Sequence, residues 1–144
     1  MDLIAKADIK IQNPIDEVFE AIIDQHKLAG YFVSSSNGRM EPGATLTWRW
    51  DDANAEGQVV VDRVEKNTRI VFRWGMGPER TTVTMELEKS GEGGTKVRVE
   101  EDGWAKDDNG IASYAGNTRG WTNFLDCLKA FLEYGINLRK GAFF

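Results

Sequence analysis

The sequence predicts a single α+β domain in which a curved antiparallel sheet of about six strands wraps around one long C-terminal helix. Three observations lead to this prediction. Short segments of alternating apolar and polar residues, separated by turn residues, fill residues 43–102. Helical periodicity occurs before and after this block, and no linker divides residues 1–144. Because helices and strands are segregated along the chain, we expect the helices to pack on one face of the sheet.

One strand and two short helices are expected near the N-terminus. Ile9 and Ile11 alternate with polar neighbours, which is the pattern of a half-buried strand. Asn13 then provides a helix cap and Pro14 a first turn. Apolar residues recur at helical spacing to about residue 26. Residues 26–32 are expected to form a second short helix or a turn, followed by a polar loop at residues 34–38.

Five further strands are expected where apolar and polar side chains alternate. They lie near residues 45–50, 58–64, 70–74, 82–87 and 96–100. Turn sequences separate them, including Gly75-Met76-Gly77-Pro78 and Gly91-Glu92-Gly93-Gly94. Since short loops join consecutive strands, neighbours are expected to pair antiparallel.

The last element is predicted to be a long amphipathic helix. Its apolar stripe recurs at steps of one, three and four residues and comprises Trp121, Phe124, Leu125, Leu128, Phe131, Leu132 and Ile136. One helix cannot cover the inner face of a wide sheet unless the sheet curls. Curling leaves a space between sheet and helix, and this space is the predicted ligand site.

Three stretches of the chain resemble the START-like, helix-grip superfamily, also called SRPBCC. They are Ile11-Gln12-Asn13-Pro14-Ile15-Asp16-Glu17-Val18-Phe19, Val99-Glu100-Glu101-Asp102-Gly103-Trp104, and Gly120-Trp121-Thr122-Asn123-Phe124-Leu125-Asp126-Cys127-Leu128-Lys129-Ala130-Phe131-Leu132-Glu133-Tyr134-Gly135. Within the superfamily, the chain resembles the bacterial branch homologous to the activator of heat-shock protein ninety ATPase (AHSA-type). The resemblance implies a hydrophobic ligand cavity and a link to the stress response. It does not imply one activity, because this fold serves cyclases, hydrolases, lipid carriers and chaperone accessories.

A set of residues is predicted to bind the ligand because their phase directs them to the interior. They are Trp48, Trp50, Phe72, Trp74, Val83, Met85, Val99, Glu101, Tyr114, Thr118, Trp121 and Leu125. Any one of them taken alone fits an ordinary core position. Several indole N–H groups together, however, suit a pocket with apolar walls and polar tips better than a dry core.

Glu101 is the strongest single candidate for a functional residue, because it alternates with Val97 and Val99 and should therefore face the interior like them. A carboxylate there would bind a polar ligand group or accept a proton. In the alternative, the strand bulges or ends, and Glu101 turns to solvent or pairs with Arg49, Arg73 or Arg119.

Glycines and a terminal pair of aromatics leave further alternatives open. Gly110, Gly116 and Gly120 each weaken a helix by up to about 1 kcal/mol relative to Ala. They indicate either a kinked or mobile lid over the pocket mouth, or close backbone packing against bulky Trp residues. Phe143 and Phe144 form either a contact patch for a partner or a second copy of the chain, or a cover for a sheet edge.

Charge and composition exclude several classes of function. The net charge of −5 argues against nucleic acid as a partner. No apolar run is long enough to span a membrane, and the charged start is unlike a signal peptide. The single cysteine, Cys127, fits a core thiol and a cytoplasmic location. Neither Cys127 nor the single histidine, His26, has partners at metal-ligand or triad spacing, so no metal, cofactor or hydrolase site is expected.

Three functions remain open from the sequence. The leading hypothesis is non-catalytic binding or transport of a small hydrophobic ligand, a lipid or an aromatic compound, between sheet and C-terminal helix. The second is a chaperone-accessory interaction module of the heat-shock protein ninety ATPase activator type. The third is a cyclase or dehydratase in which a pocket carboxylate transfers a proton.

Overall fold

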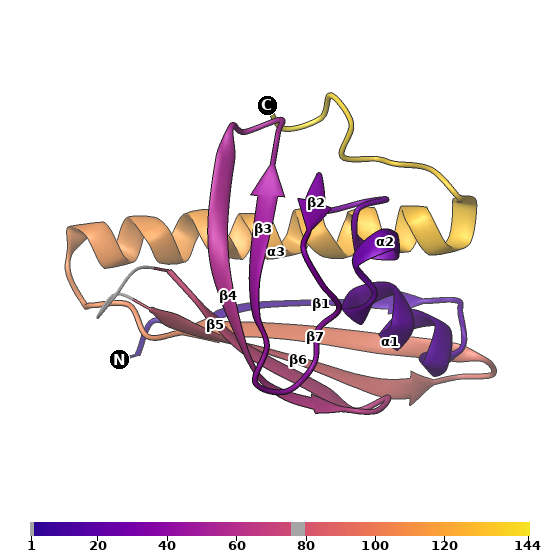
Figure 1. Cartoon of the computed structure of the whole chain (residues 1–144). Helices are drawn as coiled ribbons and strands as arrows, with labels where there is room; N and C mark the ends of the chain where they lie inside the picture. The colour runs from indigo at the N-terminus through magenta and orange to yellow at the C-terminus, as the bar shows by residue number, and fades with distance from the viewer. Residues whose placement is uncertain (1, 76–79) are drawn as a thin grey trace.

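The computed structural model describes residues 2–75 and 80–144, which form seven strands and three helices (Figure 1). In chain order these are β1 (Ala5–Ile11), α1 (Ile15–Ile23), α2 (Gln25–Leu28), β2 (Ser35–Ser36), β3 (Thr45–Trp50), β4 (Ala55–Glu65), β5 (Arg69–Trp74), β6 (Thr81–Ser90), β7 (Gly94–Asp102) and α3 (Asp108–Tyr134). The turn predicted at Gly75-Met76-Gly77-Pro78 falls mostly on residues 76–79, which lie outside the described residues.

The strands form one antiparallel sheet with the order β1-β7-β6-β5-β4-β3-β2. The predicted α+β class and the antiparallel pairing are therefore confirmed. The additional strand is β2, which falls in the segment expected to be a polar loop. It pairs with β3, and the preceding backbone N–H of Ser34 donates to the Arg49 carbonyl at 2.8 Å. Two residues are too few to produce an alternating pattern, so the sequence could not reveal this strand.

An irregularity in β4 helps to explain why the sheet curves. The register of β4 against β5 shifts between Val61 and Arg63. Such a bulge bends its strand and increases the local twist. In Figure 1, β3 and β4 rise at a steep angle to β6 and β7, and α3 runs across the hollow of the bent sheet. The sheet therefore wraps the helix, as predicted.

Two short helices follow β1, as predicted, but the boundary between them differs: the first ends at Ile23 rather than at about residue 26, and the second is confined to Gln25–Leu28. Asp24 has an extended backbone (φ −82°, ψ 122°), which ends α1, and its carboxylate caps α2 by accepting from the Lys27 N–H at 3.0 Å. Asn13 is not the cap of α1. Pro14 occupies that position, and the Asn13 side chain donates to Glu17 at 3.2 Å. Apolar side chains continue at helical spacing past Asp24, so the sequence pattern did not show that the first helix ends there.

Helix α3 begins earlier than its apolar stripe and ends before Ile136. The Asp107 side chain caps its start by accepting from the Gly110 N–H at 2.8 Å. A Cβ on Gly110 would lie 1.7 Å from a backbone carbonyl oxygen of the preceding loop, so this position requires glycine. Gly135 adopts a left-handed conformation (φ 68°) that ends the helix. Ile136, expected on the buried stripe, therefore lies beyond α3 and is 51% exposed.

The rest of the stripe packs onto the sheet. Trp121, Phe124, Leu125 and Leu128 are buried, and Phe131 and Leu132 are half-buried against them. Cys127 is buried in the same cluster, and burial raises the pKa of its thiol, so it stays protonated as a core residue. This face of α3 packs against the sheet, and its Trp121 lines the candidate site described below.

Candidate functional site

A pocket of about 390 Å³ lies between the middle of α3, the turn joining β3 to β4, and the C-terminal tail. We call it the aromatic pocket. Its lining residues are Phe32, Trp50, Ala53, Ala55, Trp74, Gly116, Asn117, Arg119, Gly120, Trp121, Asn123, Arg139, Phe143 and Phe144. A space of this size falls in the range of small-molecule sites, and six of the lining side chains are aromatic.

The indole rings of the pocket are held in a fixed arrangement. Trp50 ends β3, Trp74 ends β5, and Trp121 lies in the middle of α3. The rings of Trp74 and Trp121 stack at 5.3 Å between centroids, with an interplanar angle of 27°. Trp50 meets Trp74 edge-on at 6.2 Å, and Phe32 meets Trp50 in the same way at 5.6 Å. Rigid aromatic walls of this kind offer large contact area at a small cost in conformational entropy.

Glu101 lies behind this wall and holds two of the indoles in place. It is 1% exposed, and both carboxylate oxygens accept hydrogen bonds. Trp74 Nε1 and Thr81 Oγ1 donate to Oε2 at 2.8 and 2.6 Å. Trp121 Nε1 and Asn117 Nδ2 donate to Oε1 at 2.7 and 2.9 Å. The carboxylate thus joins β5, β6, β7 and α3, and four donors compensate for its burial.

The inward phase predicted for Glu101 is therefore what the structure has, and the alternative of solvent or arginine contact is wrong. β7 continues regularly to Asp102, so no bulge turns Glu101 outward. Its partners are indole, hydroxyl and amide groups rather than Arg49, Arg73 or Arg119. Glu101 is also not among the residues that line the aromatic pocket. It acts on the pocket through Trp74 and Trp121 and is a positioning residue.

Gly116 and Gly120 leave the α3 side of the pocket open. Both line it, and a Cβ added to either would meet nothing within 4 Å. The interpretation that they allow close packing against Trp residues is therefore wrong; Gly110 does allow a close approach, but to the backbone of Ala105. Helix α3 runs through both positions without interruption, so no kink forms there. The two glycines cost helix stability and keep side chains out of the pocket.

The C-terminal tail folds back over the pocket instead of covering a sheet edge. It runs from the end of α3 to a terminus near the β3–β4 turn (Figure 1). Arg139 donates to both carboxylate oxygens of Asp52 at 2.9 and 3.3 Å. Its guanidinium also lies 5.6–5.8 Å from the ring centroids of Phe32, Phe143 and Phe144. Phe144 is nevertheless 72% exposed, so the tail covers the pocket only in part.

Apart from Glu101, the predicted ligand residues divide into three groups. Trp50, Trp74 and Trp121 line the aromatic pocket. Deeper core positions are occupied by Trp48, Phe72, Val83, Met85, Val99 and Leu125, which are buried and do not line it. Neither Tyr114 nor Thr118 lines the pocket: the Tyr114 ring packs against Trp104, and the Thr118 hydroxyl donates to the Tyr114 carbonyl. The role of all of them in ligand binding stays a prediction.

Several pocket residues were not predicted from the sequence. They come from loops, the start of β4, the tail and the polar side of α3, and comprise Phe32, Ala53, Ala55, Asn117, Asn123 and Arg139. Loop residues carry no periodicity that would give their direction. Asn117 and Asn123 lie near Trp121 on α3, and the neighbouring Gly116 and Gly120 were the only signal that this helix face is open.

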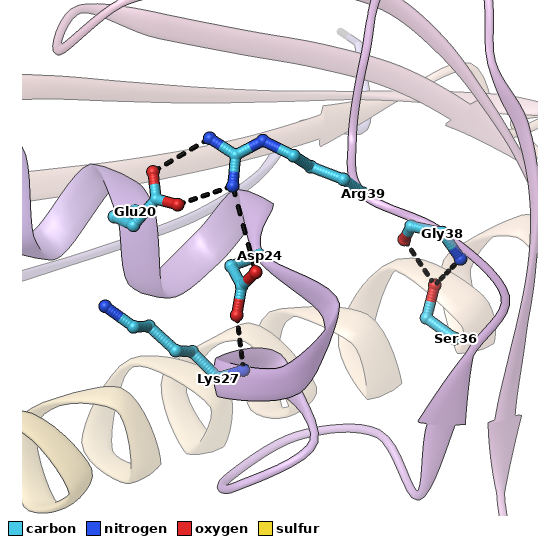
Figure 2. Close-up of polar contacts among 6 residues, drawn as sticks. All are labelled: Glu20, Asp24, Lys27, Ser36, Gly38 and Arg39. Atoms are coloured by element: carbon cyan, nitrogen blue, oxygen red, sulfur yellow. Dashed lines mark hydrogen bonds and ion pairs between the residues drawn. The ribbon is translucent and has the colours of Figure 1, made fainter.

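A second hollow, of about 640 Å³, lies over α1 and the segment before β3. Figure 2 shows that two of its charged residues, Glu20 and Arg39, are paired with each other. Arg39 donates to the two oxygens of Glu20 at 2.5 and 2.8 Å and approaches Asp24 at 3.8 Å. The Arg39 guanidinium lowers the pKa of Glu20, and Glu20 raises the pKa of Arg39 in turn. This network connects α1 to the segment between β2 and β3, so a structural role explains why these charged residues lie together.

Other chemistry finds little support in residues 2–75 and 80–144. They contain no group of three His, Cys, Asp or Glu side chains arranged to hold a metal ion. His26 is exposed on α2, outside both hollows. No helix within these residues is long and apolar enough to cross a membrane.

A curved antiparallel sheet, a long C-terminal helix across it and a pocket between them define a helix-grip protein. The family model described as Activator of Hsp90 ATPase homolog 1-like protein matches residues 12–133, and the chain belongs to this family. The resemblance noted in the sequence is thereby confirmed.

Solved structures share this fold over nearly the whole chain. SSP2350 from Staphylococcus saprophyticus is 34% identical, with a TM-score of 0.81 over 94% of this chain and 96% of that one. DynU16, from the dynemicin biosynthetic locus, is 27% identical with a TM-score of 0.82; the match covers 94% of this chain but 49% of DynU16. The Aha1 dimer from Colwellia psychrerythraea is 22% identical with a TM-score of 0.79, over 92% and 97% of the two chains. A comparison with curated proteins finds no match.

Proposed function

We propose that this protein binds or carries a small hydrophobic ligand in the aromatic pocket and does not transform it. The observation that carries this proposal is a pocket of about 390 Å³ with six aromatic side chains in its lining. The two glycines of α3 keep the space open at a cost in helix stability, which favours a site selected for occupancy over a defect in packing. Membership of the helix-grip class supports the proposal.

The test is a titration with N-phenyl-1-naphthylamine, an uncharged fluorescent probe. We expect binding of one probe per chain and a loss of about tenfold in affinity for Trp50→Ala, because the truncated indole contributes contact area to the wall. Trp50 is preferable to Trp121 for this purpose, since Trp50 has no bond to Glu101 to break. Tyr134→Ala is the matched control, because Tyr134 is 71% exposed and lies outside the pocket. Absence of stoichiometric probe binding would count against the proposal.

The second candidate is a chaperone accessory, which the family assignment favours. Its working surface would be external, and Tyr134, Ile136 and Leu138 supply exposed apolar groups where α3 ends. Stimulation of the ATPase of an Hsp90 homologue, lost in Ile136→Asp but kept in Trp50→Ala, would support this function over ligand carriage. No stimulation by the intact protein would argue against it.

A cyclase or dehydratase mechanism has the least support from the geometry. It needs a carboxylate that reaches the substrate, whereas Glu101 lies behind the wall and its oxygens are engaged by four donors. The cytoplasmic location and a role in the stress response stay predictions.

A further inference from the structure

The charged side chains that line the aromatic pocket are both cationic, although the chain has a net charge of −5. Arg139 is already engaged by the carboxylate of Asp52. Arg119 is exposed and has neither an ion-pair nor a hydrogen-bond partner among residues 2–75 and 80–144, and no Asp or Glu side chain from those residues lines the pocket. A guanidinium beside an aromatic wall, with no acidic side chain to pair with, favours an anion brought by the ligand.

A second polar group lies next to Arg119. Asn123 follows it by four residues on α3, so the two side chains occupy the same helix face. Asn123 is half-buried in the pocket wall, and its amide has no hydrogen-bond partner within the described part of the chain. Gly120 stands beside them without a side chain, and a Cβ there would meet nothing within 4 Å. The helix surface at Gly120, between these two polar residues in sequence, is therefore open.

We infer that the ligand of the aromatic pocket is an aromatic organic anion. Its ring system lies against Trp50, Trp74 and Trp121, and its anionic group, a carboxylate, sulfonate or phosphate, accepts hydrogen bonds from Arg119 and Asn123. This inference rests on the proposed function and narrows it from any hydrophobic ligand to one with a charged end. Because Arg119 is exposed, salt should screen the ion pair between its guanidinium and the anionic group of the ligand.

A matched pair of probes separates the inference from the proposal on which it rests. N-phenyl-1-naphthylamine and 1-anilinonaphthalene-8-sulfonate share one ring system and differ by a sulfonate group. We expect the sulfonate to bind about tenfold more tightly at low ionic strength, with the advantage shrinking as salt is added. Arg119→Gln should abolish this advantage and leave the affinity for the uncharged probe unchanged.

Two control variants make the outcome decisive. Arg63→Gln removes one positive charge from an exposed site outside the pocket and should keep the preference for the anion. If the preference survives in Arg119→Gln, or if both probes bind the wild-type protein equally, the inference is wrong although the pocket still binds hydrophobic ligands. Loss of the preference in Arg139→Gln alone would place the anion on the tail and overturn the assignment to Arg119. If neither probe binds, the proposed function fails as well.

Discussion

Replacing Glu101 with Gln tests the role of the buried carboxylate with the smallest change in shape. Each oxygen of Glu101 accepts from one indole and from one group that can change direction. The hydroxyl of Thr81 can rotate to accept a bond, and the amide of Asn117 can flip to do the same, whereas an indole N–H can only donate. A glutamine NH₂ can therefore be accommodated on either side, but always next to an indole N–H that loses its acceptor.

The expected loss follows from this count. One buried donor left without a partner costs about 1–3 kcal/mol. With a urea dependence of about 2 kcal/mol per molar, the unfolding midpoint should fall by about 1 M. Far-UV circular dichroism is the appropriate probe, because the fluorescence of Trp74 and Trp121 would change for local reasons. Glu101→Ala, which strands all four donors, should lose more.

The neighbouring residue provides the control. Glu100 precedes Glu101 on β7 but faces solvent, so Glu100→Gln should leave the free energy of unfolding unchanged within about 0.5 kcal/mol. The reasoning is refuted if Glu101→Gln is as stable as the wild-type protein, because the four hydrogen bonds would then contribute nothing that an amide cannot replace.

Three further changes have defined outcomes. Gly116→Ala or Gly120→Ala should raise the free energy of unfolding by up to about 1 kcal/mol, which calorimetry would show as a melting temperature about 3 °C higher. Probe affinity should fall, because a methyl group enters the pocket. Lower stability of either variant would show that its position needs glycine. Tyr31→Phe removes the bond to the Ala21 carbonyl and should cost about 1 kcal/mol at pH 7. Burial raises the pKa of Tyr31, so the folded protein favours the neutral phenol, and the stabilisation from this group is lost as pH rises above about 10. The difference in free energy of unfolding between wild type and Tyr31→Phe, measured in urea, should therefore shrink above that pH. A difference that stays constant with pH would contradict this reasoning. Asp52→Asn should free the tail from Arg139 and speed proteolysis after residue 135 with little change in global unfolding, whereas unchanged cleavage would mean that the ion pair does not hold the tail.

The general fold could be predicted because its periodicities are long and consistent. Alternation over residues 43–102 gave the face of each strand, and the stripe predicted from Trp121 to Ile136 gave the buried side of α3 as far as Leu132. The same reasoning failed at helix ends. Asp24 ends the first helix earlier than predicted and Gly135 ends the last one before Ile136, through backbone conformations that apolar spacing does not report.

The site was predictable in part, for a related reason. Trp48 and Trp50 share one face of β3, yet Trp48 is 1% exposed in the core and Trp50 lines the pocket. Alternation gives the face of a side chain but not its distance from the crossing helix. Phe32 and Arg139 reach the pocket from a loop and the tail, where placement depends on tertiary contacts alone.

The indole N–H signals of a ¹⁵N-labelled sample, followed during titration with N-phenyl-1-naphthylamine, test the existence of a ligand site most directly. The five Trp residues report from different depths, so the spectrum locates the guest as well as detecting it. We expect the largest shifts at Trp50, Trp74 and Trp121, and the smallest at Trp104, which packs against Tyr114 outside the pocket. No shift at saturating probe, or shifts confined to Trp104, would contradict a ligand site between sheet and helix.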